Sequence, residues 1–600
     1  MFNPTNDSIR DIELKKLECL KEMSDAKDRI LKELSGVDKI TLTRLRQVLD
    51  DYNNIDYNVS NKVTAIETFT NELNKRSEEN VKKFEDSLNK IDYLSNYVTP
   101  QMFGAKGDGI NNDTLAIQSA IDYSLINSTI VYLPKVKDYY KISKSLVVES
   151  DTTIISNGAI IKCSEGNYAE NCVGYGVFSN KSEDDSLINV TLDGITIYVD
   201  RYTWHGVYFH ANNVMENITL KNITVYNPKW DGVLCHGCDS VPYDSDRKAY
   251  TPNEKVNLRY KIIDCKFINE YIEEKTRTGV MIENCHNAII KNCYVRGFHT
   301  GFHCEGSSDI VFDSCVGEDN NNDYHRNDGL YNADFMIGRV ENVTMTNCKS
   351  RRITKESEFN YEDISGTIRY NSLYIPNSFL RGFKIIGCSF VGGLIKSDIA
   401  DKENIKKIGL TFIGCDFDNC SFNITSTTNE LDGLIINACK FENTPILLSK
   451  CKNFNITNNV FINPSLTSVE ISSSSYGNII NNVLKGGKNT GTLTWKKGII
   501  VYSGCSDLNI NNNNFITNEE YSGGNYTIGF YGENNRVKII NNNFDVISGY
   551  VLASNDSNIS NNCIIVNNII KYSNVGDEKG FQSSKINTDN SIIENNIIEE

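Results

Sequence analysis

The chain has 600 residues, of which 40% are hydrophobic, and it holds 31 tyrosines against 9 prolines. This composition is typical of a folded protein and excludes an intrinsically disordered one. A formal net charge of −16 argues against nucleic acid as the main partner.

The N-terminal part of the chain is predicted to be helical. Apolar residues from Val59 to Leu73 follow alternating steps of four and three residues, which is typical of a coiled coil. We therefore expect a helical attachment region over residues 1–55 and a coiled-coil-like stem over residues 56–97. The alternative is one amphipathic helix lying along a domain. Because soluble assemblies favour closed symmetry, a stem of this kind favours a homo-oligomer.

Targeting and redox signals point to synthesis in a reducing cytosol. The start of the chain lacks the apolar core of a signal peptide, and no apolar run is long enough to cross a bilayer, so we expect no membrane insertion. The 18 cysteines are spread along the chain, so we expect mostly buried thiols rather than a disulfide framework.

From residue 98 to residue 600 the chain is predicted to be a repeat array. One pattern recurs: a β-branched or apolar pair, a polar residue, Cys or Asn, any residue, and then an apolar residue. Copies are spaced by 20 to 40 residues, which predicts one rung of a parallel β-helix per repeat. Cys and Asn at the same place predict a stacked column of buried thiols followed by an asparagine ladder. These residues are Cys265, Cys293, Cys315, Cys348, Cys388, Cys415, Cys439, Asn459, Asn482, Asn513 and Asn542.

A glycine-rich turn followed by a short helix precedes this array. The turn runs over residues 103–109, Asn112 or Asp113 can cap a helix start, and residues 115–121 carry one apolar face. This segment resembles the opening of the pectate-lyase-like right-handed parallel β-helices, above all those of bacteriophage tail spikes and neck appendages. The resemblance implies a mainly β, right-handed, single-stranded parallel β-helix whose first rung is covered by a helix near residues 113–124.

The resemblance also implies a function. Proteins of this kind are homotrimeric virion components of the phage tail, made in the host cytoplasm and acting outside the cell. By this resemblance the chain would bind and depolymerise a bacterial surface glycan during host attachment, and its N-terminal helical region would join tail or baseplate proteins. A non-catalytic receptor-binding or structural tail fibre is the alternative, and a teichoic acid hydrolase is a third option. Fold alone does not decide among them.

Residues suited to sugar chemistry are concentrated in one window. All seven histidines lie between His205 and His325, together with two of the three tryptophans. If successive rungs place these segments on one face, aromatic rings suit sugar faces and carboxylates suit acid–base work on a glycosidic bond. For the aromatic residues and histidines, the alternative to a binding groove is that they only stack along the solenoid. For the Asp-Gly pairs, the alternative to catalysis is an ordinary turn. The predicted catalytic residues are Asp231, Glu305, Asp328, His236 and His325. The predicted substrate-binding residues are Trp204, His205, Tyr208, His210, Trp230, His303, Tyr324 and Arg326.

The reaction type stays open at this stage. A hydrolase would use two carboxylates, whereas a lyase would use His236 or His325 as base, with Arg326 or a divalent cation such as calcium neutralising a uronate. The motif set of polygalacturonases is missing, so pectin is a poor substrate prediction. The single Cys-x-x-Cys pair at residues 235–238 is a weak zinc signal. We therefore expect no resident metal or cofactor.

Overall fold

The computed structural model describes residues 97–599 apart from 170–171, 184–185, 212–213, 237–257, 272–275, 321–332, 353–370, 377–379, 400–406, 427–429, 463–466, 487–496, 517–525, 547–549, 555–560 and 573–589. The predicted attachment region and all but Tyr97 of the predicted stem lie outside these residues. The described chain forms two compact units, a smaller one of residues 97–106, 115–134 and 153–155 and a larger one of the remainder. No helix among the described residues is long and apolar enough to cross a membrane.

The smaller unit contains the predicted helix. Strand β1 (Tyr97–Val98) pairs in parallel with β2 (Ile130–Leu133), and η1 (Pro100–Phe103) and α3 (Thr114–Asn127) lie between them in the chain. Helix α3 buries Ile117, Ala120 and Ile121, so the predicted apolar face is confirmed. The Phe103 and Tyr123 rings lie 5.7 Å apart and join η1 to the helix. That this helix covers the first rung stays a prediction.

The predicted glycine turn is also confirmed. Gly107 and Gly109 have φ angles of 58° and 70°, values that favour glycine because they crowd a Cβ atom. The Gly107 N–H donates to Asp113 Oδ2 at 3.0 Å, and Asn112 Oδ1 accepts the N–H of Thr114, the first helical residue, at 3.0 Å. The two polar residues therefore hold the turn and the start of the helix.

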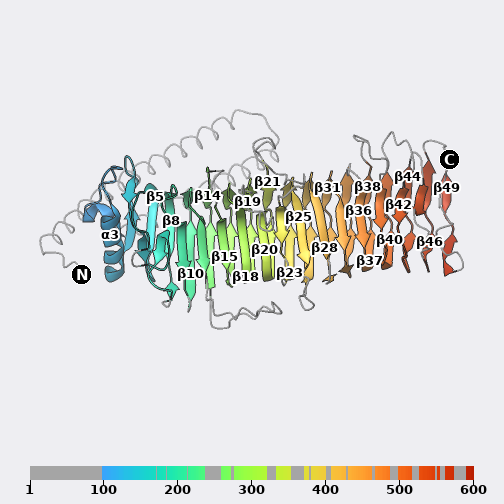
Figure 1. The fold of residues 1–600 in the computed structure, drawn as a ribbon, viewed down its shortest axis with the longest axis horizontal. Coiled ribbons are helices and arrows are strands. Elements are labelled where there is room, and N and C mark those ends of the chain that lie inside the picture. The colour runs from blue at the N-terminus through green and yellow to red at the C-terminus, as the bar shows by residue number, and fades with distance from the viewer. Residues whose placement is uncertain are drawn as a thin grey trace, which may run out of the picture. The chain divides into compact units, whose positions relative to one another are not determined.

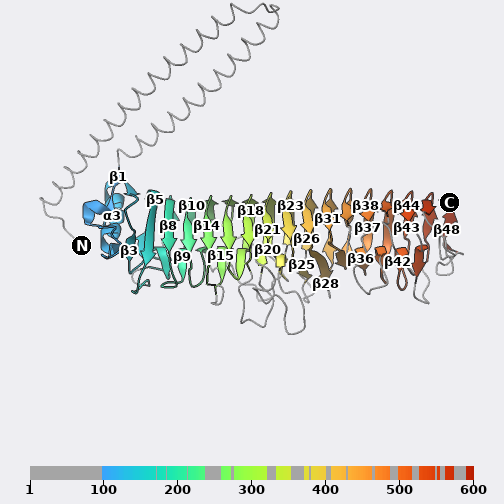
Figure 2. The ribbon, with the colours of Figure 1, turned by 90° about the horizontal axis from the view of Figure 1, so that it is seen from above.

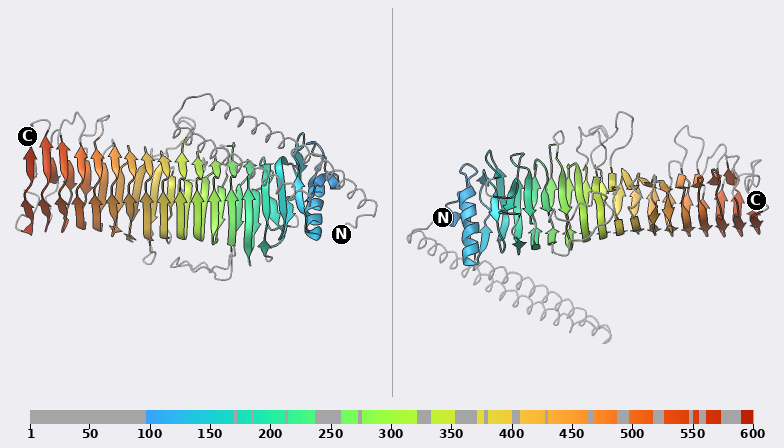
Figure 3. Two further views of the ribbon diagram at one scale, coloured as in Figure 1. Left: turned by 180° about the vertical axis from the view of Figure 1, so that it is seen from behind. Right: turned by 60° about the horizontal axis from the view of Figure 1, so that its bottom comes forward.

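The larger unit is a parallel β-helix. Every rung supplies one strand to each of three parallel sheets, and the chain passes to the next rung after the third strand. Figure 1 shows the strands side by side in the order of the sequence, with the colours running from cyan to red along the stack, and Figure 2 and Figure 3 show the same order from other sides. All registered pairs are parallel, for example β10 with β13 and β11 with β14. The mainly β fold predicted from the repeats is therefore confirmed.

The first sheet comprises β10 (Met215–Lys221), β13 (Leu258–Ile263), β16 (Ala288–Lys291), β23 (Leu380–Ile386), β26 (Lys407–Ile413), β30 (Ile435–Asn437), β34 (Asn455–Thr457), β37 (Ser475–Ile480), β40 (Ser506–Asn511), β43 (Lys538–Ile540), β46 (Ile564–Val566) and β48 (Ile592–Glu594). The second sheet comprises β11 (Thr224–Tyr226), β14 (Lys266–Ile268), β17 (Tyr294–Arg296), β19 (Val316–Glu318), β21 (Lys349–Arg351), β24 (Ser389–Val391), β27 (Asp416–Asp418), β31 (Lys440–Glu442), β35 (Val460–Ile462), β38 (Val483–Lys485), β41 (Asn514–Ile516), β44 (Asn543–Val546), β47 (Ile569–Tyr572) and β49 (Ile597–Glu599).

The third sheet, which carries the candidate site, comprises β4 (Leu146–Val148), β6 (Gly176–Asn180), β9 (His205–His210), β12 (Val233–His236), β15 (Thr278–Glu283), β22 (Asn371–Ile375), β25 (Leu394–Ile399), β28 (Ser421–Ser426), β32 (Ile446–Ser449), β36 (Thr467–Ser472), β39 (Lys497–Val501), β42 (Tyr526–Phe530) and β45 (Tyr550–Ser554). The long strands β18 (Thr300–Asp313) and β20 (Ala333–Thr346) run from the third sheet into the first, and β8 (Thr191–Tyr198) runs from the first into the second. The remaining strands are β3 (Tyr140–Ile142), β5 (Thr153–Cys163), β7 (Leu187–Ile188), β29 (Leu431–Asp432) and β33 (Cys451–Lys452).

The turn between the first and second sheets explains the recurring Cys and Asn. From residue 264 to residue 568, each of these turns has a residue of positive φ, such as Asn292 (φ 51°) or Asn458 (φ 58°), followed by a buried Cys or Asn. Asn459 Nδ2 donates to Asn482 Oδ1 at 3.0 Å, and Asn482 Nδ2 donates to Asn513 Oδ1 at 3.0 Å. The predicted thiol column and asparagine ladder are therefore confirmed, and all 16 cysteines of the described residues are free thiols.

Candidate functional site

Four strands of the third sheet begin with the same local sequence, which aligns the site. In each strand, any two residues are followed by a glycine and then by an apolar residue. The register pairs these apolar residues, Val207 with Val233, Val233 with Val280 and Val280 with Phe302. We call Gly206, Gly232, Gly279 and Gly301 the corner glycines. A Cβ atom on Gly232 would lie 2.5 Å from the Gly279 carbonyl oxygen of the next rung. Only glycine fits this corner, so side chains that precede it stack from rung to rung.

Three of the residues two positions before the corner glycines, Trp204, Trp230 and Arg277, are exposed and form a row with Tyr175, which lies beside Trp204 on the neighbouring strand. We define the aromatic row as Tyr175, Trp204, Trp230 and Arg277. The Tyr175 and Trp204 rings stack at 4.8 Å, and the Trp204 and Trp230 rings meet edge to face at 4.4 Å. The Arg277 guanidinium lies 5.7 Å from the centre of the Trp230 ring. Tyr175, Trp204 and Trp230 are 45%, 37% and 41% exposed, so their rings are available to a ligand.

The residues that directly follow Trp204 and Trp230 form a buried contact between a histidine and an aspartate. His205 Nδ1 lies 3.1 Å from Asp231 Oδ2, and Asp231 Oδ1 accepts the Thr278 N–H at 2.9 Å. The Asp231 side chain is 0% exposed. A carboxylate in this position does not reach a ligand at the surface. The geometry therefore favours a positioning role for Asp231 over the catalytic role predicted from the sequence.

At the opposite ends of the same strands lies a row of ionisable side chains. We define the charged row as His210, His236, Glu283 and Glu305, which form the last register pair between each two neighbouring strands of β9, β12, β15 and β18. The His210 and His236 rings lie 4.5 Å apart, and His236 Nε2 lies 3.6 Å from Glu283 Oε2. His210 Nδ1 also contacts Glu183 Oε2 at 3.2 Å. Along the row, two imidazoles in ring contact are thus followed by two carboxylates at paired register positions.

Glu305 is the most strongly perturbed carboxylate of this row. His303 Nε2 lies 3.4 Å from its Oε2, and Arg339 Nε donates to its Oε1 at 2.8 Å. Burial by itself raises the pKa of Glu305, but His303 and Arg339 together outweigh burial and lower the pKa to about 2. Glu305 is therefore ionised at neutral pH, which suits a nucleophile, a base or a charge stabiliser rather than a proton donor.

The middle of the strands separates the two rows. Here Tyr208, Leu234, Met281, His303 and Met336 are register neighbours, and Leu234, Met281, His303 and Met336 are buried. The Tyr208 ring lies 5.0 Å from His205 and 6.4 Å from His210, so it links the rows. The exposed part of this face is the aromatic row, whereas the charged row is partly buried.

The sequence predictions for this site had mixed outcomes. The structure brings Trp204, His205, Trp230 and Asp231 together at one edge of the third sheet. It brings Tyr208, His210, His236, His303 and Glu305 together along the same strands. Tyr324, His325, Arg326 and Asp328 lie outside the described residues, so their roles stay predictions. Sequence reasoning missed Tyr175, Glu183, Arg277, Glu283 and Arg339.

No group of three or more His, Cys, Asp or Glu side chains within the described parts of the chain is arranged to hold a metal ion. Cys235 of the weak zinc signal is a buried free thiol, and burial raises its pKa to about 12. The other cysteine of this signal, Cys238, lies outside the described residues.

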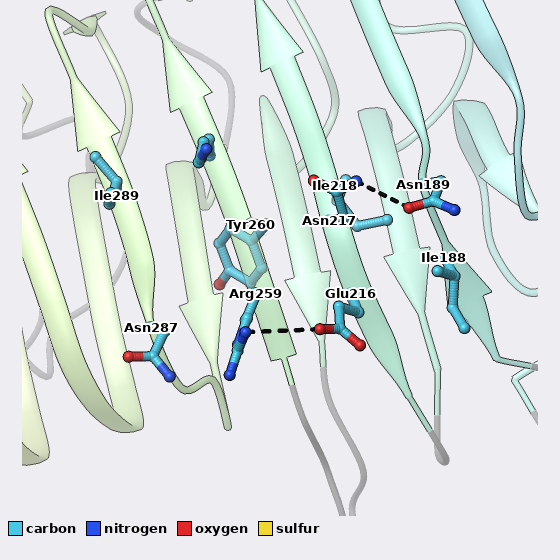
Figure 4. Close-up of a pocket in the computed structure, with 10 residues that line it drawn as sticks. Ile188, Asn189, Glu216, Asn217, Ile218, Arg259, Tyr260, Asn287 and Ile289 are labelled. Atoms are coloured by element: carbon cyan, nitrogen blue, oxygen red, sulfur yellow. Dashed lines mark hydrogen bonds and ion pairs between the residues drawn. The ribbon is translucent and has the colours of Figure 1, made fainter.

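A separate pocket of about 480 Å³ lies on the first sheet, lined by residues of β7, β10, β13 and β16. Figure 4 shows Arg259 facing Glu216, at 3.7 Å, and Asn217 facing Asn189. The Asn217 amide donates to Asn189 Oδ1 at 2.8 Å, and the Asn189 amide donates to Asp151 at 2.8 Å. These amides already serve the turns of the solenoid, so the third sheet is the stronger candidate.

Comparison with known proteins finds similarity over the N-terminal part of the β-helix. Residues 99–324 match the family model described as rhamnogalacturonase A/epimerase, pectate lyase-like. Over 142 residues the chain is 33% identical to a capsule K30/K69-specific depolymerase of Klebsiella phage K64-1, and over 35 residues it is 54% identical to a capsule KN3-specific depolymerase of Klebsiella phage KN3-1. These matches cover 22% and 6% of this chain, and 18% and 4% of the two relatives.

Two of the solved structures that match this chain come from phages. Pre-mature gene product 12 of bacteriophage phi29 is 14% identical, with a TM-score of 0.43 over 83% of this chain and 68% of that chain. The tailspike protein of Acinetobacter baumannii phage AM24 is 12% identical, with a TM-score of 0.28 over 58% of this chain and 54% of that chain.

Proposed function

We propose that the protein is a phage tail spike that binds a bacterial capsular polysaccharide and cleaves it on the third sheet. The observation that carries the proposal is the register of β9, β12, β15 and β18, which aligns four ionisable residues at one end and exposed aromatic rings at the other. Aromatic faces and paired ionisable groups are what glycosidic cleavage requires. The two matched Klebsiella phage proteins are capsule depolymerases, which supports the substrate class.

In this proposal the charged row carries the chemistry. Glu305, held ionised by His303 and Arg339, acts as nucleophile or base. Glu283 lies at the matching position of the neighbouring strand, and paired strands are about 4.8 Å apart. This spacing is close to the roughly 5–5.5 Å of the carboxylate pair in retaining glycosidases. In such a pair Glu283, which contacts His236 at 3.6 Å, is the proton donor to the leaving oxygen.

A lyase reaction would use the same row differently. His236 in its neutral form would remove the proton next to a uronate carboxylate, the glycosidic C–O bond would break, and a carbon–carbon double bond would form in the product. An unsaturated uronate absorbs ultraviolet light, whereas hydrolysis creates reducing ends without this absorbance. The product therefore separates the two reactions.

The deciding experiment incubates the full chain with capsular polysaccharides of candidate hosts and measures reducing ends and ultraviolet absorbance. We expect Glu305→Gln and Glu283→Gln to lower the cleavage rate by about a hundredfold or more, as is usual for an acid–base group. Glu341→Gln is a matched control, because Glu341 has the same partial exposure, 26% against 25%, and an arginine partner at 3.3 Å, but lies in the first-sheet half of β20. Unchanged cleavage in both variants would place the reaction elsewhere.

One observation favours a binding-only spike as the second candidate. The charged row is paired throughout: His210 with Glu183, His236 with Glu283, and Glu305 with His303 and Arg339. Such pairs also occur as purely structural contacts. Tight binding of a capsule without any new ends would support this candidate. A teichoic acid hydrolase, the third option, would release phosphate-containing fragments.

The assembly of the spike is part of the proposal. A homotrimer with a helical attachment region at residues 1–55, a coiled-coil-like stem at 56–97 and tail or baseplate partners fits a virion component that acts outside the cell. Light scattering of the full chain tests the trimer. A shortened chain that lacks residues 1–96 would be expected to lose incorporation into virions.

A further inference from the structure

The aromatic row is built as a fixed surface rather than as a set of independent side chains. The Trp204 N–H donates to the Tyr175 carbonyl at 3.1 Å, the Trp230 N–H to the Trp204 carbonyl at 2.7 Å, and the Arg277 N–H to the Trp230 carbonyl at 3.0 Å. The buried Asp231 lies one residue after Trp230 and one rung before Thr278, whose N–H it accepts. Both the spacing and the order of these side chains are therefore set by the backbone before any ligand arrives.

Arg277 gives this surface a charge that the rest of the row lacks. The Arg277 side chain is exposed and lies over the Trp230 ring at 5.7 Å. No carboxylate of the described residues lies within ion-pair distance of it. Other exposed arginines of the larger unit do have such partners, for example Arg259 with Glu216 at 3.7 Å and Arg381 with Glu341 at 3.3 Å. In a chain with a net charge of −16, a guanidinium beside two exposed tryptophans is an unusual combination.

We propose that the aromatic row binds an acidic sugar unit, with the ring of the sugar on Trp204 and Trp230 and its carboxylate on Arg277. The inference rests on the proposed function in that it requires a polysaccharide ligand, but it does not require cleavage. Aromatic side chains take the apolar face of a sugar ring, and a planar guanidinium binds a carboxylate through two parallel N–H donors. Arg277 is thus a specificity-determining residue that selects acidic over neutral glycans.

Tryptophan fluorescence can be used to follow binding at this site, because most of the tryptophans of the chain lie in it. The chain has three tryptophans, two of which are Trp204 and Trp230. The third, Trp495, lies outside the described residues and is removed by Trp495→Phe. In this background the emission is titrated with capsular polysaccharides that contain a uronic acid, and with the same polymers after their carboxyl groups have been reduced to alcohols. The test variant is Arg277→Gln, and the matched control is Arg259→Gln, an exposed arginine on the first sheet.

We expect an acidic polymer to change the emission, and Arg277→Gln to weaken its binding about ten- to hundredfold, the loss of one charge-assisted contact. Arg259→Gln should bind like the parent. The carboxyl-reduced polymer should bind the parent and Arg277→Gln with equal, low affinity. Equal binding of acidic and reduced polymers by the parent, or of the acidic polymer by parent and Arg277→Gln, would overturn the inference.

The cleavage assay on the same polymers separates this inference from the proposed function. Cleavage of an acidic polymer without any dependence on Arg277 would overturn the inference and leave the depolymerase standing. Binding that depends on Arg277 without cleavage would support the inference and overturn the depolymerase. A parent that neither binds nor cleaves any polymer of the panel would overturn both.

Discussion

His205 Nδ1 and Asp231 Oδ2 lie 3.1 Å apart between neighbouring rungs, with almost no exposed surface. The aromatic rings of Trp204 and Trp230 directly precede these two residues in the chain, and they are exposed. The buried pair and the exposed pair therefore share one stretch of backbone. A substitution in the buried pair is therefore expected to displace the two exposed rings.

Asp231→Ala is expected to lower the free energy of unfolding by about 3 kcal/mol, because it leaves His205 and the Thr278 N–H without their buried acceptor. Chemical denaturation followed by circular dichroism measures the loss. The double variant with His205→Ala should cost less than the sum of the single changes. A fully stable Asp231→Asn protein that no longer cleaves would instead support the catalytic role predicted from the sequence.

Glu305 predicts a dependence of stability on pH. The pKa of Glu305 is lowered from 4.5 to about 2, since His303 and Arg339 outweigh the effect of burial. A lowered pKa stabilises the folded state above the unfolded value, and this stabilisation is lost as the pH falls from about 4.5 to about 2. The loss for this group is on the order of 3 kcal/mol.

The Glu305→Gln protein lacks this contribution, so its stability should fall less steeply than that of the parent across the same pH range. Thermal unfolding at a series of pH values measures both slopes, with Glu341→Gln as the comparison. Parallel curves for parent and Glu305→Gln would contradict the low pKa of Glu305.

The asparagine ladder predicts a large effect of a small change. Asn513 Oδ1 accepts the Asn482 N–H at 2.9 Å, and its Nδ2 donates to the Ile479 carbonyl at 2.8 Å. Asn513→Ala leaves these buried groups without partners and is expected to cost about 3 kcal/mol. Asn512→Gly is the matched control, because the neighbouring Asn512 is exposed and its φ of 54° suits glycine. Equal stability of the two variants would show that the ladder is not needed.

The thiols are predicted to be unreactive in the folded protein. Of the 18 cysteines in the sequence, 15 are buried free thiols in the structure, so at most three, Cys19, Cys172 and Cys238, should react with dithionitrobenzoate before unfolding. Burial also raises the pKa of Cys163, Cys304 and Cys451 to about 12, which suppresses the thiolate. Denaturant should expose all 18. Rapid reaction of many thiols without denaturant would contradict the buried column.

The repeats could be predicted because every rung repeats the same turn, and the Cys or Asn after that turn is visible in one sequence. The charged and aromatic rows were harder, because their register depends on loops of different length between rungs. A signal was nevertheless present. Arg277-Thr278-Gly279-Val280 has the same form as Trp230-Asp231-Gly232-Val233, and aligning the two finds both Arg277 and Glu283. The burial of Asp231 had no such signal, since an Asp-Gly pair is equally typical of an exposed turn.

The corner glycines and the ladders have a consequence for how such a chain can change. Removing one residue from a rung turns the following side chains to the opposite face, whereas removing a whole rung keeps the register of the strands that remain. The segment from Cys293 to the residue before Cys315 is one such unit of 22 residues, and its excision would bring Cys315 onto the position of Cys293. The protein would be shorter by one step, and Glu305 would leave with the excised unit. Whole rungs are therefore natural units of exchange between related β-helices, each carrying its own surface side chains.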